Sequence, residues 1–567
     1  MAETDRRVAA TLPVEQHPHE ELVWEPPGPG SWSLDKSHVP RPVTRFTAEN
    51  APPAFQRGFA DFFRRYGIPA KEMREAYING LSYTAVVRPA PEELGERAAT
   101  AETIFVDKPW RAELARWDAE VKPASIRHHR ALAAVDVDGI STAALVDHLR
   151  DCRNNVVAMI EQHHVFNGAA MIPVGDLLAG VQEWTDGAVT DAEVLQLFAG
   201  ASPISQGHCP ELSDVVDALR TDARAAALLA AADDELDPAE LLDALRRTDQ
   251  VDVTTVRAID EWLTLVGHRI VDGFDVTLPR VIERPAILVS ALRHARAPRP
   301  PDAAPPAPDL VRERIPAEHR AEFDERLTEA RLVYRLRDER GIYSDATADG
   351  LMRRAMLAAG NRLAAAGRLP SPELAFEAGL DELIALLDDG SGAPDVGELQ
   401  ARQRLRARYT ADDAPELLGD PPSPPPPLEL LPPAMARVTK AMLAVIGNMG
   451  AGPSEGAAAP DAGTRLIGIA ASPGRHEGPA RIVHTVEDLL RVEPGDVLVA
   501  ITTAESFNLA MSFAAAVVTD QGGLLGHAAI TSREYGIPAV VGTHRATTAI
   551  ADGTRVVVDG TTGEVSW

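Results

Sequence analysis

The sequence predicts a multidomain protein, with a mainly α-helical N-terminal body followed by a C-terminal α/β domain. Three observations support this fold class. The chain has 567 residues, which at about 150 residues per domain leaves room for three or four domains. Apolar residues recur three and four positions apart through much of residues 51–400, which is the helical period. After residue 464, short β-branched runs bounded by Gly, Pro and Asp alternate with helical stretches, as in a compact α/β domain.

Composition divides the chain into four parts. Residues 1–115 are expected to form a Pro-rich arm and a first helical segment, and residues 116–410 the main helical domain. Residues 411–463 are rich in Pro and then in Gly and Ala, which predicts a linker that is first stiff and then flexible, with one short helix around 434–446. Residues 464–567 form the α/β domain.

The helical body contains stretches that combine the helical period with helix end signals. Residues 53–67 end at a glycine, and residues 141–166 start with Ser-Thr. Residues 321–341 and 347–369 each finish in or near glycine beside basic residues, as helix C-termini often do. In the α/β part we expect strands and then helices over the following residues: strands 465–470, 480–485, 496–501, 514–520, 538–542 and 555–560; helices 505–513, 526–536 and 544–550.

The charge balance excludes several classes of partner. Acidic residues number 84 and basic residues 56, so the formal net charge is −28. Such a surface repels nucleic acid and anionic lipid, so we expect neither of them as a partner. The sequence has no run of 18 apolar residues, and we therefore expect a cytoplasmic location. The chain has two cysteines, Cys152 and Cys209, too few for a disulfide framework or a Cys-rich zinc site. No metal site is expected.

The sharpest local signal is the segment from Thr519 to Ile530, TDQGGLLGHAAI. A predicted strand ends there, a Gly-Gly turn follows, and a helix begins near His527 and ends at Gly536. Free N–H groups in the first turn of a helix favour an anion, and turn glycines allow close approach. These surroundings suit a histidine that carries a phosphoryl group. The expected phosphate-binding residues are Gly522, Gly523, Gly526, Ala528 and Arg533.

Residues 465–567 resemble the mobile, swivelling phosphohistidine domain of phosphoenolpyruvate-utilising enzymes, the family that includes pyruvate phosphate dikinase and rifampin phosphotransferase. The resemblance implies that His527 is the phosphoryl carrier. Besides the histidine segment, the matching stretches are 471–474, 478–481, 494–500 and 552–560. Two positions depart from the family pattern. Gly526 replaces the usual Ser or Thr before the histidine, and Thr502 begins TTAESFN in place of Thr-x-Pro. A lost hydroxyl donor in a dry site costs about 1–3 kcal/mol.

The helical body resembles the substrate-binding domain of rifampin phosphotransferase-like enzymes, and residues 30–42 and 79–83 resemble the α subunit of phenylphosphate synthase. The resemblance implies a substrate site. Arginine can donate two hydrogen bonds to phosphoryl oxygens, which makes Arg337 a catalytic candidate. His268 is a candidate acid or base toward the hydroxyl of a substrate. The candidate substrate-binding residues are Arg269, Asp275, Glu283 and His163. For Arg269, Asp275 and Glu283 the alternative is a buried ion-pair network that holds helices together.

A histidine that carries a phosphoryl group must first receive it from a donor. In the resembled enzymes this is an ATP-grasp domain or a phosphoenolpyruvate-binding barrel, and the sequence shows neither, nor a glycine-rich loop with lysine. We therefore expect a separate ATP-binding protein as the donor, with ATP and Mg²⁺ on that partner and no tightly bound cofactor here.

We expect a phosphotransferase that is one component of a multi-protein system and acts in secondary metabolism. His527 would pass its phosphoryl group to a hydroxyl of a small alcohol or phenol in the helical domain. Two alternatives remain open. One is a binding or regulatory protein with an inactive carrier domain, and the other is a lyase or dehydratase that uses the helical cavity. The sequence identifies neither the acceptor nor the oligomeric state.

Overall fold

The computed structural model describes residues 22–206, 210–230, 237–271, 273–295, 308–422, 424, 427–450, 464–503, 507, 511 and 513–567. These residues belong to two compact units. Unit 1 comprises residues 1–169, 268–279 and 340–439, and unit 2 comprises 170–267, 280–339 and 440–567. The helical body contributes to both units, so this division does not follow the boundaries expected at 115, 410 and 463. The domain boundaries themselves stay a prediction.

Unit 1 is built mainly from helices around α5 (Thr142–Val165). Helix α1 (Arg45–Arg65) and helix α16 (Ala346–Ala365) both pack on α5. Their buried faces share one apolar core that includes Leu149, Met352 and Leu363. Ser141 caps α5 by accepting from the Ala144 N–H, as the sequence predicts. The other helical segments of this unit are α2 (Pro91–Asp107), α3 (Pro109–Arg116), η2 (Trp117–Val121), α4 (Lys122–Ala133), η6 (Gly341–Asp345), η7 (Pro372–Glu377), α17 (Leu380–Leu387), α18 (Val396–Arg408), η8 (Ala411–Asp413) and η9 (Leu428–Leu430).

Unit 1 also contains a four-stranded sheet in the order β2-β3-β1-β4. Strands β2 (Glu72–Ile78) and β3 (Leu81–Val87) form a hairpin, and β1 (Ser31–Leu34) pairs with β3 and with β4 (Leu417–Gly419). The prediction of only an arm and a helical segment over residues 1–115 was wrong for residues 72–87, which form this hairpin. The hairpin turn is Asn79-Gly80, both with positive φ, a pair that favours a two-residue hairpin turn.

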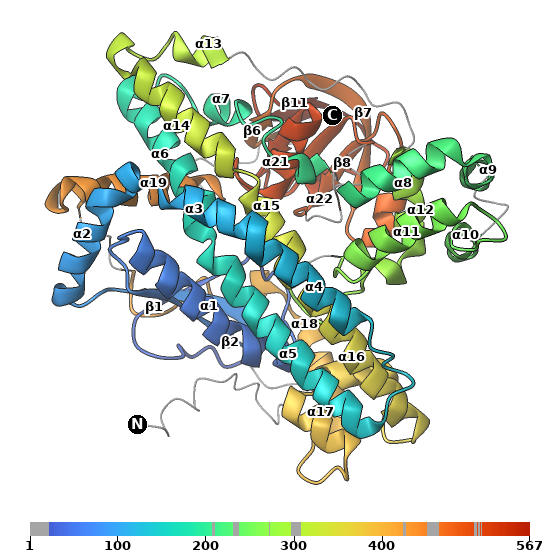
Figure 1. Ribbon diagram of the computed structural model, residues 1–567. Helices are drawn as coiled ribbons and strands as arrows, with labels where there is room; N and C mark the ends of the chain where they lie inside the picture. The colour runs from blue at the N-terminus through green and yellow to red at the C-terminus, as the bar shows by residue number, and fades with distance from the viewer. Residues whose placement is uncertain are drawn as a thin grey trace. The chain divides into compact units, whose positions relative to one another are not determined.

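Unit 2 begins with helices and ends with the α/β domain. Its α-helices, labelled in Figure 1, are α6 (Asn167–Thr185, which starts in unit 1), α7 (Asp191–Gln196), α8 (Pro210–Thr221), α9 (Ala223–Ala230), α10 (Pro238–Leu245), α11 (Val253–Val266), α12 (Pro285–Ala295), α13 (Pro308–Arg312), α14 (Arg320–Val333), α15 (Leu336–Arg340, which ends in unit 1) and α19 (Pro433–Asn448, which starts in unit 1). Three short helical turns lie between them: η3 (Pro203–Gln206), η4 (Val281–Glu283) and η5 (Ala317–His319). Together with unit 1 they confirm the predicted mainly helical body.

The C-terminal domain is an eight-stranded sheet in the order β5-β12-β11-β7-β8-β9-β10-β6. The pairs β7–β8, β8–β9 and β9–β10 are parallel, and the other pairs are antiparallel. Val499, Val518 and Val540 lie in its core. The elements are β5 (Arg465–Ile467), β6 (Ile469–Ser472), β7 (Arg475–Val483), η10 (Val486–Arg491), β8 (Val497–Ala500), β9 (Ala516–Thr519), α21 (His527–Tyr535), β10 (Ala539–Val541), α22 (Ala546–Ala549), β11 (Arg555–Asp559) and β12 (Glu564–Ser566).

The predicted linker, residues 411–463, is partly built into the fold. Strand β4 pairs with β1, and α19 matches the short helix expected around 434–446. Residues 451–463 lie outside the described residues, as does most of the helix expected at 505–513. The predicted mobility of the linker stays a prediction.

One helical stretch among the described residues, Thr142–Thr185, is long and apolar enough to cross a membrane. Since 83% of its apolar window is buried inside the protein, it matches the core helix of a water-soluble fold equally well.

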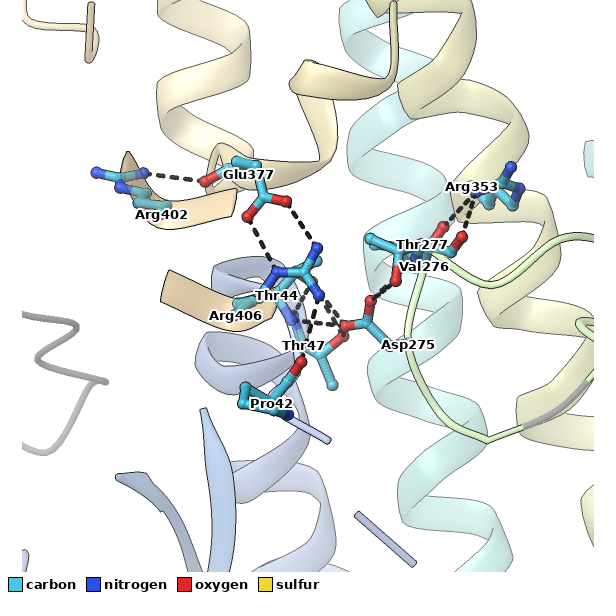
Figure 2. A network of polar contacts seen from close by, with 10 residues as sticks. All are labelled: Pro42, Thr44, Thr47, Asp275, Val276, Thr277, Arg353, Glu377, Arg402 and Arg406. Carbon is cyan, nitrogen blue, oxygen red and sulfur yellow. Dashed lines mark hydrogen bonds and ion pairs between the residues drawn. The ribbon is translucent and has the colours of Figure 1, made fainter. Parts of the chain in front are cut away.

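A buried carboxylate ties two segments of unit 1 together (Figure 2). Asp275 accepts hydrogen bonds from the Thr44 N–H at 2.7 Å, from the Thr44 and Thr47 hydroxyls at 2.9 Å each, and from the Thr277 N–H at 3.0 Å. Thr44 is also the N-cap of α1. Beside it, Arg406 donates to both carboxylate oxygens of Glu377. The residues 268–279 are thus fixed to the start of α1.

We predict that Asp275→Ala destabilises the protein by about 2–4 kcal/mol, because it leaves buried N–H groups without acceptors. Thermal unfolding followed by circular dichroism checks this. Asp138→Ala, at an exposed position of the same unit, is the matched control. Equal unfolding midpoints for the two variants contradict the prediction.

Candidate functional site

His527 lies at the end of a strand–turn–helix unit in unit 2. Strand β9 ends at Thr519, and α21 begins at His527 itself and ends before Gly536, as the sequence predicts. Gly522 has φ +107°, which L residues rarely adopt. A Cβ on Gly523 would lie 2.4 Å from the Asn448 carbonyl oxygen. The two glycines therefore serve the turn and its contact with the end of α19.

Both ring nitrogens of His527 lie beside threonine hydroxyls. The Thr503 hydroxyl is 2.9 Å from Nδ1, and the Thr531 hydroxyl, one turn along α21, is 3.4 Å from Nε2. When Nδ1 carries the ring proton, Thr503 accepts it, and the Nε2 lone pair is the nucleophile. In that tautomer the shorter contact, to Thr503, fixes Nδ1 and leaves the lone pair on Nε2.

Burial lowers the pKa of His527 to about 4, although the negative charge of Asp338 acts in the opposite direction. The imidazole is therefore neutral near pH 7. A neutral imidazole is the form that can attack phosphorus.

The first turn of α21 presents backbone donors to the same place. Gly526 is the N-cap residue and supplies no side-chain hydrogen bond to the helix. The N–H groups of His527, Ala528 and Ala529 thus lack a side-chain cap, and together with the helix dipole they favour an anion.

Gly526, the position that departs from the family pattern, is not required by its backbone conformation. Its φ of −73° and ψ of 159° are open to any residue. An added Cβ would lie 3.2 Å from the Gly523 carbonyl oxygen, so a side chain needs a shift of only a few tenths of an ångström.

Arg337 and Asp338 bring opposite charges close to this turn. Arg337 donates to the carbonyl oxygen of Leu525, and burial lowers the pKa of its guanidinium. Asp338 accepts from the hydroxyls of Ser202, at 2.8 Å, and Ser205. The structure therefore brings the predicted Arg337 to the carrier segment.

Arg533 is buried and faces main-chain acceptors. It donates to the carbonyl oxygens of Leu524 at 2.7 Å and Ala471 at 3.1 Å, and to the Tyr334 hydroxyl at 3.4 Å. These contacts hold the turn before α21 in place. The next residue, Glu534, accepts from the N–H groups of Gly200 and Ser202, and burial raises its pKa to about 7. A phosphate contact by Arg533 stays a prediction.

The comparisons with known proteins match this region directly. The family model described as "PEP-utilising enzyme, mobile domain" matches residues 492–563, which include the glycine turn, His527 and all of α21. This part of the chain is similar to the mobile domain of PEP-utilising enzymes. A second model, "Rifampicin phosphotransferase fourth domain", matches residues 166–362. Both resemblances inferred from the sequence are confirmed, and the resemblance to the phenylphosphate synthase α subunit stays a prediction.

Relatives match parts of this chain within longer chains of their own. An uncharacterised protein of Mycobacterium tuberculosis is 32% identical over 373 residues, covering 65% of this chain and 37% of the relative. An uncharacterised phosphotransferase of Bacillus subtilis is 45% identical over 101 residues, covering 18% and 12%. A probable phosphoenolpyruvate synthase of Archaeoglobus fulgidus is 48% identical over 100 residues, covering 18% and 13%. The chain spans well under half the length of each of these relatives.

The remaining predicted residues make contacts of their own outside residues 492–563. Glu283, in unit 2, accepts from the Arg280 Nε at 2.9 Å and from its backbone N–H at 3.2 Å. In unit 1, Asp275 is held in the network of Figure 2, and Arg269 lies over the ring of Tyr343 at 5.7 Å. Such contacts agree with the alternative in which these residues hold helices together. The substrate-binding roles of Glu283, Asp275 and Arg269 stay predictions.

Two predicted histidines lie within one polar cluster of unit 1. His163 Nδ1 is 2.9 Å from the Asp345 carboxylate. The pKa of His129 is lowered to about 4, first by burial and then by the charges of His128, Arg269 and His268. The carboxylate of Asp345 acts on His129 in the opposite direction. Asp345 therefore links the two parts of the cluster.

Sequence reasoning missed Thr503, Thr531 and Asp338 at the carrier site and Asp345 in unit 1. For Thr531 a signal was present, because a residue four positions after His527 shares its face of a helix. Thr503 and Asp345 reach their partners from distant points of the chain, which no local pattern reveals.

The anchoring role of Thr503 can be tested with a small-molecule phosphoryl donor. We predict that Thr503→Val slows phosphorylation of His527 by phosphoramidate about two- to ten-fold, the value of one hydrogen bond. Thr503→Ser keeps the hydroxyl and should stay within about two-fold of the wild type. Intact mass against time gives the rates, and equal rates for Val and Ser exclude the role.

The pKa of His527 predicts how the site responds to acid. The folded-state pKa of about 4 lies below the ordinary value of 6.5, so the ring stays neutral as the pH falls from 8 to 5 and gains its proton only near pH 4. The unfolded chain binds that proton first, so this histidine contributes stability that is lost as the pH falls from 6.5 toward 4. NMR titration, with the signal assigned through His527→Asn, measures the midpoint. A midpoint near 6.5 contradicts the prediction.

Proposed function

We propose that this protein is a phosphotransferase component in which His527 carries a phosphoryl group and passes it to a hydroxyl of a small organic molecule bound by the helical body. The observation that supports this best is the arrangement at α21. A neutral imidazole lies with Nδ1 beside the Thr503 hydroxyl, in the first turn of a helix whose N-cap supplies no side-chain acceptor.

The reaction divides into two transfers. In the first, Nε2 attacks the phosphorus of a donor, so that a P–N bond forms as the donor P–O bond breaks. In the second, the oxygen of an acceptor hydroxyl attacks that phosphorus, a P–O bond forms, and the electron pair of the P–N bond returns to Nε2. Splitting the reaction in this way replaces one difficult step with two easier ones.

Nearby charges suit both steps. Arg337 can balance the developing negative charge on the phosphoryl oxygens, since it reaches the Leu525 carbonyl two residues before His527. The N-terminus of α21 adds donors that need no reorganisation during the reaction.

As donor we propose ATP, delivered by a separate ATP-binding protein that also holds Mg²⁺. As acceptor we propose a small alcohol or phenol. The strong negative charge of the chain, −28, disfavours nucleic acid and anionic membrane as acceptors or partners.

The decisive experiment is intact mass of the protein after incubation with ATP and a candidate ATP-binding partner, with phosphoenolpyruvate as a parallel donor. We expect a gain of one phosphoryl group that is lost in acid and absent in His527→Asn. His476→Asn, a histidine elsewhere in the same domain, serves as the control and should keep the gain.

Failure of phosphoramidate to phosphorylate His527 would contradict the carrier role, because that reagent needs no protein donor. Phosphorylation by phosphoramidate but by neither ATP nor phosphoenolpyruvate would contradict only the proposed donor.

A further inference from the structure

Unit 1 contains two histidine–aspartate pairs in one polar cluster. His163 Nδ1 lies 2.9 Å from Asp345 Oδ2, and His38 Nδ1 lies 2.9 Å from Asp35 Oδ2. The side chains of the first pair are 19% and 9% exposed, and those of the second 51% and 27%. The cluster is therefore buried at Asp345 and open to solvent at His38.

The first pair is placed by a π-helical turn. Asp345 ends η6, which interrupts the helical run between α15 and α16, and such turns are frequent at functional sites. Arg340, the residue before this turn, donates to the backbone carbonyl of His163 at 3.3 Å. The turn thus brings a carboxylate and a cation to the C-terminal end of α5.

The second pair is placed by the N-terminal sheet. The carbonyl oxygen of Ser82 accepts from the Asp35 N–H at 2.9 Å, and the Ser82 hydroxyl donates to Glu75 at 2.8 Å. Burial raises the pKa of Glu75 to about 7. For Asp35, burial raises the pKa, but the charge and hydrogen bonds of His38 outweigh it and lower the value to about 2.

His164, next to His163, has different surroundings. Its ring stacks on Phe59 with centroids 4.8 Å apart and meets the edge of Phe55 at 4.6 Å. Asn167 Nδ2 lies 3.3 Å from its Nδ1. Of the two neighbouring histidines, one is packed among aromatic rings and the other faces charged groups. Packing alone does not account for His163.

We propose that His163, oriented by Asp345, is the general base that removes the proton from the acceptor hydroxyl, and that the cluster of unit 1 is the hydroxyl-binding site. This inference rests on the proposed function and deepens it. It assigns to His163 the acid–base role that the sequence analysis expected of His268.

The chemistry follows from the two nitrogens of the ring. A carboxylate beside Nδ1 favours the proton on that nitrogen and leaves the Nε2 lone pair to accept another. As the hydroxyl oxygen attacks phosphorus, its proton moves to His163 Nε2. The P–N bond on His527 breaks, its electron pair returns to His527, and the proton leaves His163 through water. Asp345 is a positioning residue, since it acts through the histidine.

Several charges from different elements act on His163. Burial lowers its pKa and Asp345 opposes this, while Arg340, from α15, and His38, from the segment after β1, lower it further. His163 is therefore neutral at pH 7, as a base must be. A weak base of this kind favours hydroxyls that lose their proton readily.

The test compares His163→Gln and Asp345→Asn with the wild type after His527 has been phosphorylated by phosphoramidate. The acceptors are phenol, the more acidic 4-nitrophenol, and 1-propanol, and the readout is loss of phosphoryl mass from His527. His128→Gln, an exposed histidine on α4, is the control. We expect His163→Gln to slow transfer to phenol about 100-fold or more. Transfer to ionised 4-nitrophenol should fall less than about ten-fold, because no proton remains to be removed.

A structural role for His163 predicts equal losses with both phenols, and that result overturns the proposal. NMR of the His163 ring gives a second readout that needs no turnover. We expect the proton on Nδ1 in the wild type, its redistribution in Asp345→Asn, and a shifted signal on addition of an accepted hydroxyl compound.

If no acceptor takes the phosphoryl group or moves the His163 signal, the assignment of the hydroxyl-binding site is overturned. If His527 cannot be phosphorylated at all, the proposed function fails instead, and the NMR measurements still decide whether Asp345 fixes the ring. Thermal unfolding of each variant separates a loss of fold from a loss of transfer.

Discussion

The hydrogen bond between Thr503 and His527 is the interaction on which the carrier site depends. An imidazole has two similar nitrogens, and only a fixed partner on one of them makes the other a defined nucleophile. Thr503 provides that partner at 2.9 Å. The glycine turn, the uncapped start of α21 and the Arg337 contact with Leu525 lie in the same segment of the chain.

The two units use charge in opposite ways. The ring of His527 lies beside two threonine hydroxyls in the first turn of α21, where free backbone N–H groups favour an anion. Unit 1 instead gathers full carboxylates, such as Asp345 and Asp35, next to histidines, which suits the movement of protons. During transfer to a hydroxyl, the oxygen gains the phosphoryl group and loses its proton. A protein that performs this reaction therefore needs both kinds of surroundings.

Local signals allowed much of this to be predicted. Helix α21 was predicted almost to the residue because Gly526 and Gly536 mark its two ends. The hairpin at 72–87 was missed, although Asn79-Gly80 signals it, because charged residues interrupt its apolar alternation. His163 pairs with Asp345, which lies 182 residues further along the chain. His527 pairs with Thr503, which lies 24 residues before it. Such contacts depend on the tertiary fold, which spacing alone does not reveal.

The extended backbone of Gly526 has an evolutionary consequence. Glycine and serine codons can differ by a single base, and the conformation at this N-cap accepts a side chain with only a small displacement. A hydroxyl next to His527 is therefore one mutational step away, at the cost of a shift of a few tenths of an ångström at the Gly523 carbonyl. Selection can thus change the donors beside the imidazole by exchanging one small residue, while Thr503 and the helix that hold the ring stay the same.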